Sequence, residues 1–253
     1  MGIFSTPVRV ASTVNFFARA NADHQFLACN FRYEAEAPFT LFLPLPTPPD
    51  APANAVRFIN LSGYDEFFSD MRRGFPNLTR DTGKQSFTDR LLEKVRDWLD
   101  LDTTQIEFAF FRNRTVLADM REHWPVSDAV WTALEPYAGC GLVGLKLEAG
   151  ANRLPPIAFE FPRRNLDELT FPTAHNLPLA AAAQLRHALY AQTAQRSLQW
   201  RISINAEDER PIRARDFVKT DRTLGLIDPD QPIVSRRLVG PTENLDVRLI
   251  EAA

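Results

Sequence analysis

A strict alternation of apolar residues across the first 45 positions limits the folds open to this chain more than any other pattern in it. A period of two places every second side chain of an extended strand on one face. Three runs follow this period: Val8, Val10, Val14 and Phe16; Leu27, Cys29, Phe31 and Tyr33; and Phe39, Leu41, Leu43 and Leu45. The polar break at 21–25 has the length of a hairpin. We therefore predict three consecutive antiparallel strands that pack on a core by one face.

The composition extends this prediction to the whole chain. The 253 residues include 19 Phe and 19 Pro but only 10 Gly, which favours many short strands joined by stiff connections. We predict an α+β fold that consists mainly of antiparallel β-sheet with a few amphipathic helices. The length suits one compact unit, 1–253, and the alternative is two lobes, 1–150 and 151–253, that meet at Gly150–Pro156.

Four segments have helical features. Ser62, with Asp65 three residues later, predicts a helix start, and an apolar stripe follows at Tyr64, Phe67, Phe68 and Met71. We expect this stripe to be core, and a binding face is the alternative. A second helix is predicted to start near Ser86, a third to span 126–137, and a fourth to cover the alanine-rich stretch 179–195. Further strands are predicted at 56–60, 106–111, 141–147, 157–161 and 198–204.

A proline-rich stretch follows the third strand. Pro44 and Pro46 have no N–H to donate, so the strand should lie at a sheet edge or end there. The stretch through Pro52 is predicted to be an extended, exposed connector. Pro46–Pro49 also has the PxxP spacing of a docking ligand, but its neighbours are Asp50 and alanines instead of basic residues.

Several classes of function conflict with the composition. A net charge of −3 gives no basic face for nucleic acid, and no apolar run approaches the roughly 20 residues of a membrane span. Cys29 and Cys140 are too few for a disulfide framework or a zinc site, so we expect reduced thiols, a cytoplasmic protein, no metal and no cofactor. The start at Met1–Thr6 matches a myristoylation pattern, which we attribute to chance.

The best candidate for a ligand site lies in "FEFPRRNLDELTFPTAH". His175 follows a predicted strand exit, and Arg163 and Arg164 lie upstream. Two guanidinium groups and an imidazole could bind an anion. The alternative is an ordinary solvated loop. No hydrolase elbow, dinucleotide fingerprint or phosphate loop is present in the sequence.

Four segments resemble an uncharacterised bacterial protein family. They are "LFLPLP" at 41–46, "FINLSGYDEFFSDMRRGFP" at 58–76, "IAFEFPRR" at 157–164 and "LTFPTAHN" at 169–176. The resemblance implies a bacterial, soluble and β-rich protein, and it implies no activity and no catalytic residue. The family's segment after Phe-Pro-Thr-x-His is strand-like, which conflicts with the helix predicted over 179–195.

Two hypotheses of function remain. The first is a non-catalytic binding or assembly component of a complex, with a protein partner or self-association. The second is an enzyme acting on a small anionic substrate with His175 and Arg163 or Arg164. The enzyme requires these side chains to converge in a deep pocket, whereas a binding protein requires an exposed apolar surface.

Overall fold

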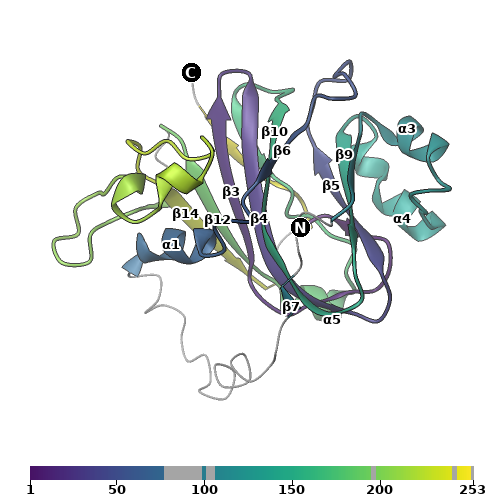
Figure 1. Cartoon of the computed structure of the whole chain (residues 1–253), viewed down its shortest axis with the longest axis horizontal. Coiled ribbons are helices and arrows are strands. Elements are labelled where there is room, and N and C mark those ends of the chain that lie inside the picture. The colour runs from purple at the N-terminus through teal and green to yellow at the C-terminus, as the bar shows by residue number, and fades with distance from the viewer. Residues whose placement is uncertain (77–98, 101–105, 195–197, 241–243, 252–253) are drawn as a thin grey trace.

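The computed structural model describes residues 1–76, 99–100, 106–194, 198–240 and 244–251. Most strands belong to two sheets that lie face to face (Figure 1). The large sheet has the order β13-β14-β12-β3-β4-β10-β6, and β2 and β7 pair with β4 and β10. The small sheet has the order β1-β5-β9-β8, and β11 pairs with β15 separately. The predicted β-rich α+β fold is confirmed.

The strands of the large sheet are β13 (Arg201–Ile202), β14 (Val234–Val239), β12 (Arg186–Gln192), β3 (Val14–Asn21), β4 (His24–Ala35), β10 (Gly150–Pro162), β6 (Arg57–Asn60), β2 (Arg9–Val10) and β7 (Leu99–Asp100). Those of the small sheet are β1 (Ile3–Phe4), β5 (Phe39–Leu45), β9 (Gly141–Leu147) and β8 (Phe108–Phe111). The separate pair is β11 (Glu168–Phe171) and β15 (Val247–Ile250). The helices are α1 (Phe67–Arg73), α3 (Arg114–Asp119), α4 (Asp128–Ala133) and α5 (Leu179–Ala182).

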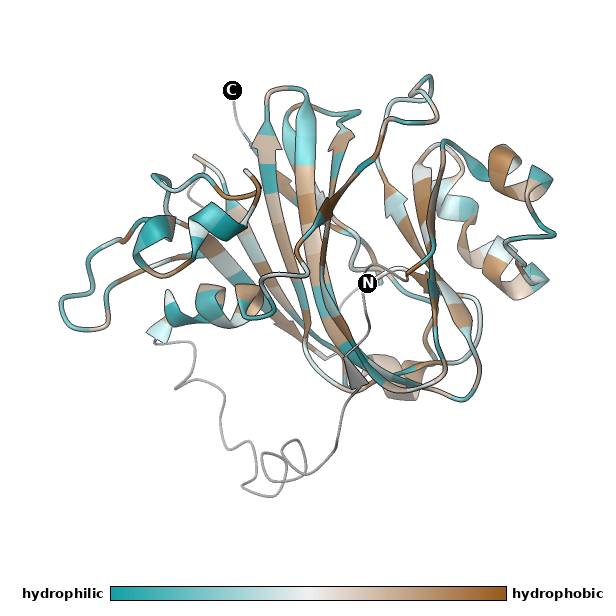
Figure 2. Ribbon diagram, viewed as in Figure 1, coloured by the Kyte–Doolittle hydropathy of each residue, from teal (hydrophilic) through white to brown (hydrophobic). Residues whose placement is uncertain are grey.

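Apolar residues cover both faces of each sheet, which the alternation alone did not predict. Phe16 of β3 points into the core between the sheets, whereas the next residue, Phe17, packs beneath α1 on the outer face of the large sheet. The outer face of the small sheet packs against α3 and α4. The molecule therefore has four layers, and brown apolar segments run along its central strands (Figures 1 and 2).

The first three predicted strands are β3, β4 and β5, and the break at 21–25 contains the hairpin turn. β5 continues through Pro44 to Leu45, so it does not end at the first proline. Its neighbour β1 pairs only with Leu41 and Phe42. Pro44 thus lies where β5 has no second partner strand, and a missing N–H costs no ladder bond there.

The predicted boundary at Gly150–Pro156 is not a linker. These residues form the first half of β10, which pairs with β4 from Gly150↔Ala35 to Pro162↔His24. The register shifts between Leu154 and Ile157, so Pro155 and Pro156 lie in a bulge, where absent donors are tolerated. Strands from both halves of the chain share the large sheet, because β12 pairs in parallel with β3.

The helix predicted over 179–195 is wrong beyond its first turn. α5 ends at Ala182, and Arg186–Gln192 form β12, between β3 and β14. Pairing on both sides outweighs the helix propensity of alanine. The strand-like character implied by the family resemblance is the one the structure has at this position.

The other helix predictions are confirmed in part. The stripe of Tyr64, Phe67, Phe68 and Met71 is buried, but α1 begins only at Phe67, and the N–H of Ser62 bonds to the Asn60 side chain at 2.9 Å. The segment 126–137 contains α4 and a 3₁₀ turn at Glu135–Tyr137, whereas α3 was not predicted. The helix predicted near Ser86 lies outside the described residues, apart from Leu99, which is in β7.

Candidate functional site

Arg163 joins the C-terminal segment to the β3–β4 hairpin. Its side chain, 7% exposed, forms a 2.8 Å ion pair with Glu251 and donates to the Ala22 carbonyl at 2.7 Å. Its N–H donates to the Asp23 carbonyl at 2.7 Å. A buried guanidinium whose partners are a carboxylate and a carbonyl from two other segments stabilises the packing of those segments.

Arg164 points to the proline-rich connector. Its Nε and Nη2 both donate to the Thr47 carbonyl, at 3.0 and 2.8 Å, and its N–H donates to the Pro46 carbonyl at 2.8 Å. The two adjacent arginines therefore hold different segments of the chain. Arg164 is exposed, but its Nε and Nη2 are both directed at the strand exit after β5.

His175 lies beside the N-terminal strand. Its backbone is clamped by Asn244, whose side chain accepts from the His175 N–H and donates to its carbonyl. The Leu177 N–H donates to Nδ1 at 3.3 Å, so the ring accepts there. Burial and the nearby N-terminal amine lower the pKa of His175 to about 4. Among the described residues, no hydrogen bond or ion pair joins His175 to Arg163 or Arg164.

An α-amino group buried between the two sheets lies near His175. Met1 is 1% exposed, and Figure 1 places the N-terminus between the sheets. The Gly2 N–H donates to the Ala174 carbonyl at 2.8 Å, which holds the chain start in place. Burial lowers the pKa of the Met1 amine to about 4, although Asp246 and Cys29 oppose the shift. This amine is therefore neutral at neutral pH.

Asp246 and His187 are the other polar groups near this amine. The Asp246 carboxylate accepts from the Ala174 N–H at 2.9 Å and from the Tyr137 hydroxyl, and burial raises its pKa. His187 of β12 is 5% exposed and stacks on Phe16, and its Nε2 has no hydrogen-bond partner. Burial lowers the pKa of His187 to about 2, with smaller contributions from the amine and His175. We call Met1, His175, His187 and Asp246 the N-terminal polar cluster.

Sequence reasoning singled out His175 but missed the Met1 amine, His187 and Asp246. His187 lies within the stretch 179–195 that was predicted to be a helix, and no motif marks a buried chain start. The only available signal was the apolar pair Ile3–Phe4 directly after Gly2, which a solvated terminus does not need.

Two surface pockets of the structure lie away from the predicted site. These pockets, of about 650 and 710 Å³, lie beside the end of α1 and beside Ser5–Thr6, and His175, Arg163 and Arg164 line neither. Within the described part of the chain, no group of three His, Cys, Asp or Glu side chains could hold a metal ion. No helix in that part is long and apolar enough to cross a bilayer.

Comparison with solved structures assigns the fold. A crystal structure of baculovirus P35 matches with a TM-score of 0.54 at 12% identity, covering 98% of this chain and 97% of that one. The chain has the fold of P35. P35 in the crystal structure of the caspase-8/P35 complex matches with a TM-score of 0.49, also at 12% identity, covering 95% and 96% of the two chains. No family model and no curated protein matches the chain, so the resemblance to a bacterial family stays a prediction.

Proposed function

We propose that this protein is a non-catalytic component of a complex that acts by binding a partner protein. The observation that carries the proposal is that the side chains of the candidate site are already hydrogen-bonded to other parts of the chain. Arg163 and Arg164 have carbonyl or carboxylate partners from three different segments, and the His175 ring accepts from a backbone N–H. An enzyme for anions needs guanidinium groups free to meet the substrate in one pocket. The arrangement therefore supports binding over catalysis.

The fold supports a protein as the partner. P35, which shares the fold across nearly the whole of both chains, forms a complex with caspase-8. We propose a cysteine peptidase of the caspase kind as the first partner class to test. At 12% identity the likeness concerns the backbone, so the residues that contact a partner have to come from this chain itself.

The proposal includes a cytoplasmic setting. Cys29 and Cys140 are both free, which suits a reducing compartment. A bacterial origin, as the family resemblance implies, is compatible with this setting and is part of the same proposal.

The test mixes the purified chain with caspase-8 and with a panel of caspase-type peptidases, and measures mass by size exclusion with light scattering. We expect one co-eluting complex whose mass is the sum of its components. A matched variant, His175→Ala with Arg164→Ala, should co-elute equally well if it remains folded by circular dichroism. Separate elution with every peptidase of the panel would contradict the partner class, and loss of the complex in the folded variant would contradict the structural role of these side chains.

A further inference from the structure

Among the described residues, the small sheet has one edge covered by other segments and one edge, β8, that pairs with no further strand. At the β1 edge, the Gly2 N–H donates to the Ala174 carbonyl, and both the N–H and the carbonyl of Phe4 bond to the Asn176 side chain. At the opposite edge is β8, which pairs only with β9 among the described residues. An edge strand with free N–H and C=O groups is a template for another extended chain.

The hydrogen-bond register shows which groups of β8 point away from β9. The Lys146 N–H donates to the Glu107 carbonyl at 2.9 Å, so the pair Glu107↔Lys146 is of the hydrogen-bonded kind. Hydrogen-bonded and non-hydrogen-bonded pairs alternate in an antiparallel ladder. Phe108 and Phe110, opposite Leu145 and Val143, therefore direct their N–H and C=O groups away from β9.

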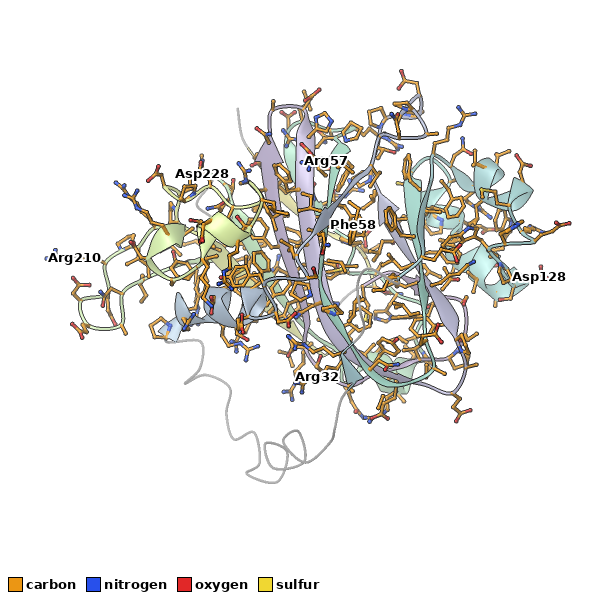
Figure 3. The ribbon with its side chains drawn as sticks, in the orientation of Figure 1. Arg32, Arg57, Phe58, Asp128, Arg210 and Asp228 are labelled. Atoms are coloured by element: carbon orange, nitrogen blue, oxygen red, sulfur yellow. The ribbon has the colours of Figure 1, made fainter. Side chains whose placement is uncertain are left out.

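In the described part of the chain, the β8 edge also lacks the features that usually protect an edge strand. β8 has the sequence Phe-Ala-Phe-Phe, with no charge, proline or bulge. Phe108 is 44% exposed, and its ring stacks on Phe58 of β6 at 4.9 Å. Figure 3 shows Phe58 in the space between the two sheets. By contrast, β6, at the edge of the large sheet, carries a charged residue, Arg57, which forms an ion pair with Glu160 of β10.

The charged residues at the two ends of β8 differ in whether they have an ion-pair partner. Glu107, before the strand, is paired with Lys146 at 2.9 Å. Arg112, directly after it, is exposed and has no ion-pair partner in the described part of the chain. A chain that pairs with β8 would therefore meet an uncompensated positive charge at one end only.

We propose that β8 is the docking edge for the partner protein, which adds an extended strand antiparallel to β8 with an acidic residue opposite Arg112. In that register, the residues two and four positions after the acid lie opposite Phe110 and Phe108 and are apolar, because cross-strand neighbours share a face. The partner motif is thus acid-x-apolar-x-apolar. This inference rests on the proposed function and names the surface that performs it.

The probe is a blocked peptide, Ser-Asp-Thr-Val-Thr-Val-Ser, titrated into the isotopically labelled full chain and followed by amide chemical shifts. We expect the largest shifts at Phe108, Phe110 and Arg112. The peptide with Lys in place of Asp should bind at least about tenfold more weakly, and Arg112→Glu should invert this preference. Shifts confined to other strands, or no preference between the two peptides, would overturn the proposal.

A matched pair of variants separates the backbone edge from the aromatic ring. Phe108→Ala removes the ring but keeps the outward N–H, whereas Phe108→Pro removes both and costs no bond to β9. We expect the Pro variant to bind the Asp peptide at least about fivefold more weakly than the Ala variant. Equal affinities would mean that no main-chain bond forms at Phe108, which contradicts strand addition.

The two proposals can fail separately. If the full chain forms a peptidase complex but the peptide does not shift β8, the function stands and the docking edge is wrong. If the peptide binds β8 but no caspase-type peptidase forms a complex, the edge stands and the partner class is wrong.

Discussion

Phe67 is a central packing residue between α1 and the large sheet. Its ring is fully buried and makes edge-on contacts with Tyr64, Phe17 and Phe68, whose ring centroids lie at 5.6, 6.1 and 4.9 Å. Phe67→Ala should lower the free energy of unfolding by about 3–5 kcal/mol, measured by urea denaturation. Leu179→Ala, at an 89% exposed site, is the control and should change it by less than about 0.5 kcal/mol. An unchanged midpoint for Phe67→Ala would mean that the stripe is not core.

The two thiols should differ in reactivity. Cys29 is 2% exposed, and burial raises its pKa to about 12, whereas Cys140 is partly exposed with a pKa raised by burial to a smaller extent. We expect an aromatic disulfide reagent to label Cys140 slowly in the native protein and Cys29 only after unfolding. The Cys140→Ser variant should show no native labelling. Rapid labelling of Cys29, or a mass showing a bridge, would contradict the structure.

At the scale of elements, the position of β1 depends on Gly2, the residue directly before the strand. Gly2 has φ of +100°, and a Cβ at this position would lie 2.5 Å from the Phe42 carbonyl oxygen. Gly2→Ala should lower the free energy of unfolding by at least about 1–3 kcal/mol, measured by urea denaturation. Gly63→Ala is the matched control, because a Cβ there meets nothing within 4 Å. Equal stability of the two variants would place Gly2 outside the core.

The strands were predicted best where a local pattern and the tertiary contacts agree. β9 occupies Gly141–Leu147 as predicted, because a short apolar run between two glycine-containing turns is typical of a buried strand. β12 was missed because its alanines favour a helix, and only the neighbours β3 and β14 make it a strand. The bulge at Pro155–Pro156 was mistaken for a boundary, since prolines mark linkers and bulges alike.

The candidate site was predictable only in part. Arg163, Arg164 and His175 were grouped as one possible anion site, but their partners Glu251, Thr47 and Asn244 are distant in the sequence. A local motif carries no information about such contacts. The buried Met1 amine was missed for the same reason, because the segments that enclose it come from the far end of the chain.

At the scale of the whole molecule, the N-terminal polar cluster links stability to pH. The pKa values of Met1, His175 and His187 fall from 8.0, 6.5 and 6.5 in the unfolded reference to about 4, 4 and 2 in the fold. Between pH 8 and pH 4 the unfolded chain therefore binds more protons, so the free energy of unfolding falls as the pH falls. The raised pKa of Asp246 opposes this trend in acid.

His187→Leu should flatten this dependence, because it removes the most strongly shifted group and an unpaired Nε2. We expect the loss of stability between pH 6 and pH 4, measured by urea unfolding, to shrink by roughly 1 kcal/mol per pH unit. Leu179→Ala, at an 89% exposed site without a titratable group, is the control and should leave the slope unchanged. An unchanged slope for His187→Leu would mean that water reaches the cluster.

We propose that this molecule acts by binding a partner through its surface, and that His175 and Arg164 stabilise the fold. The most direct test uses a caspase-type peptidase that co-elutes with the chain. The dissociation constant of this complex is measured by calorimetry, for the unchanged chain and for the folded variant that combines His175→Ala with Arg164→Ala. We expect dissociation constants that agree within about twofold, a difference of less than about 0.5 kcal/mol. A variant that keeps its circular dichroism but binds more than about tenfold more weakly would contradict the proposal.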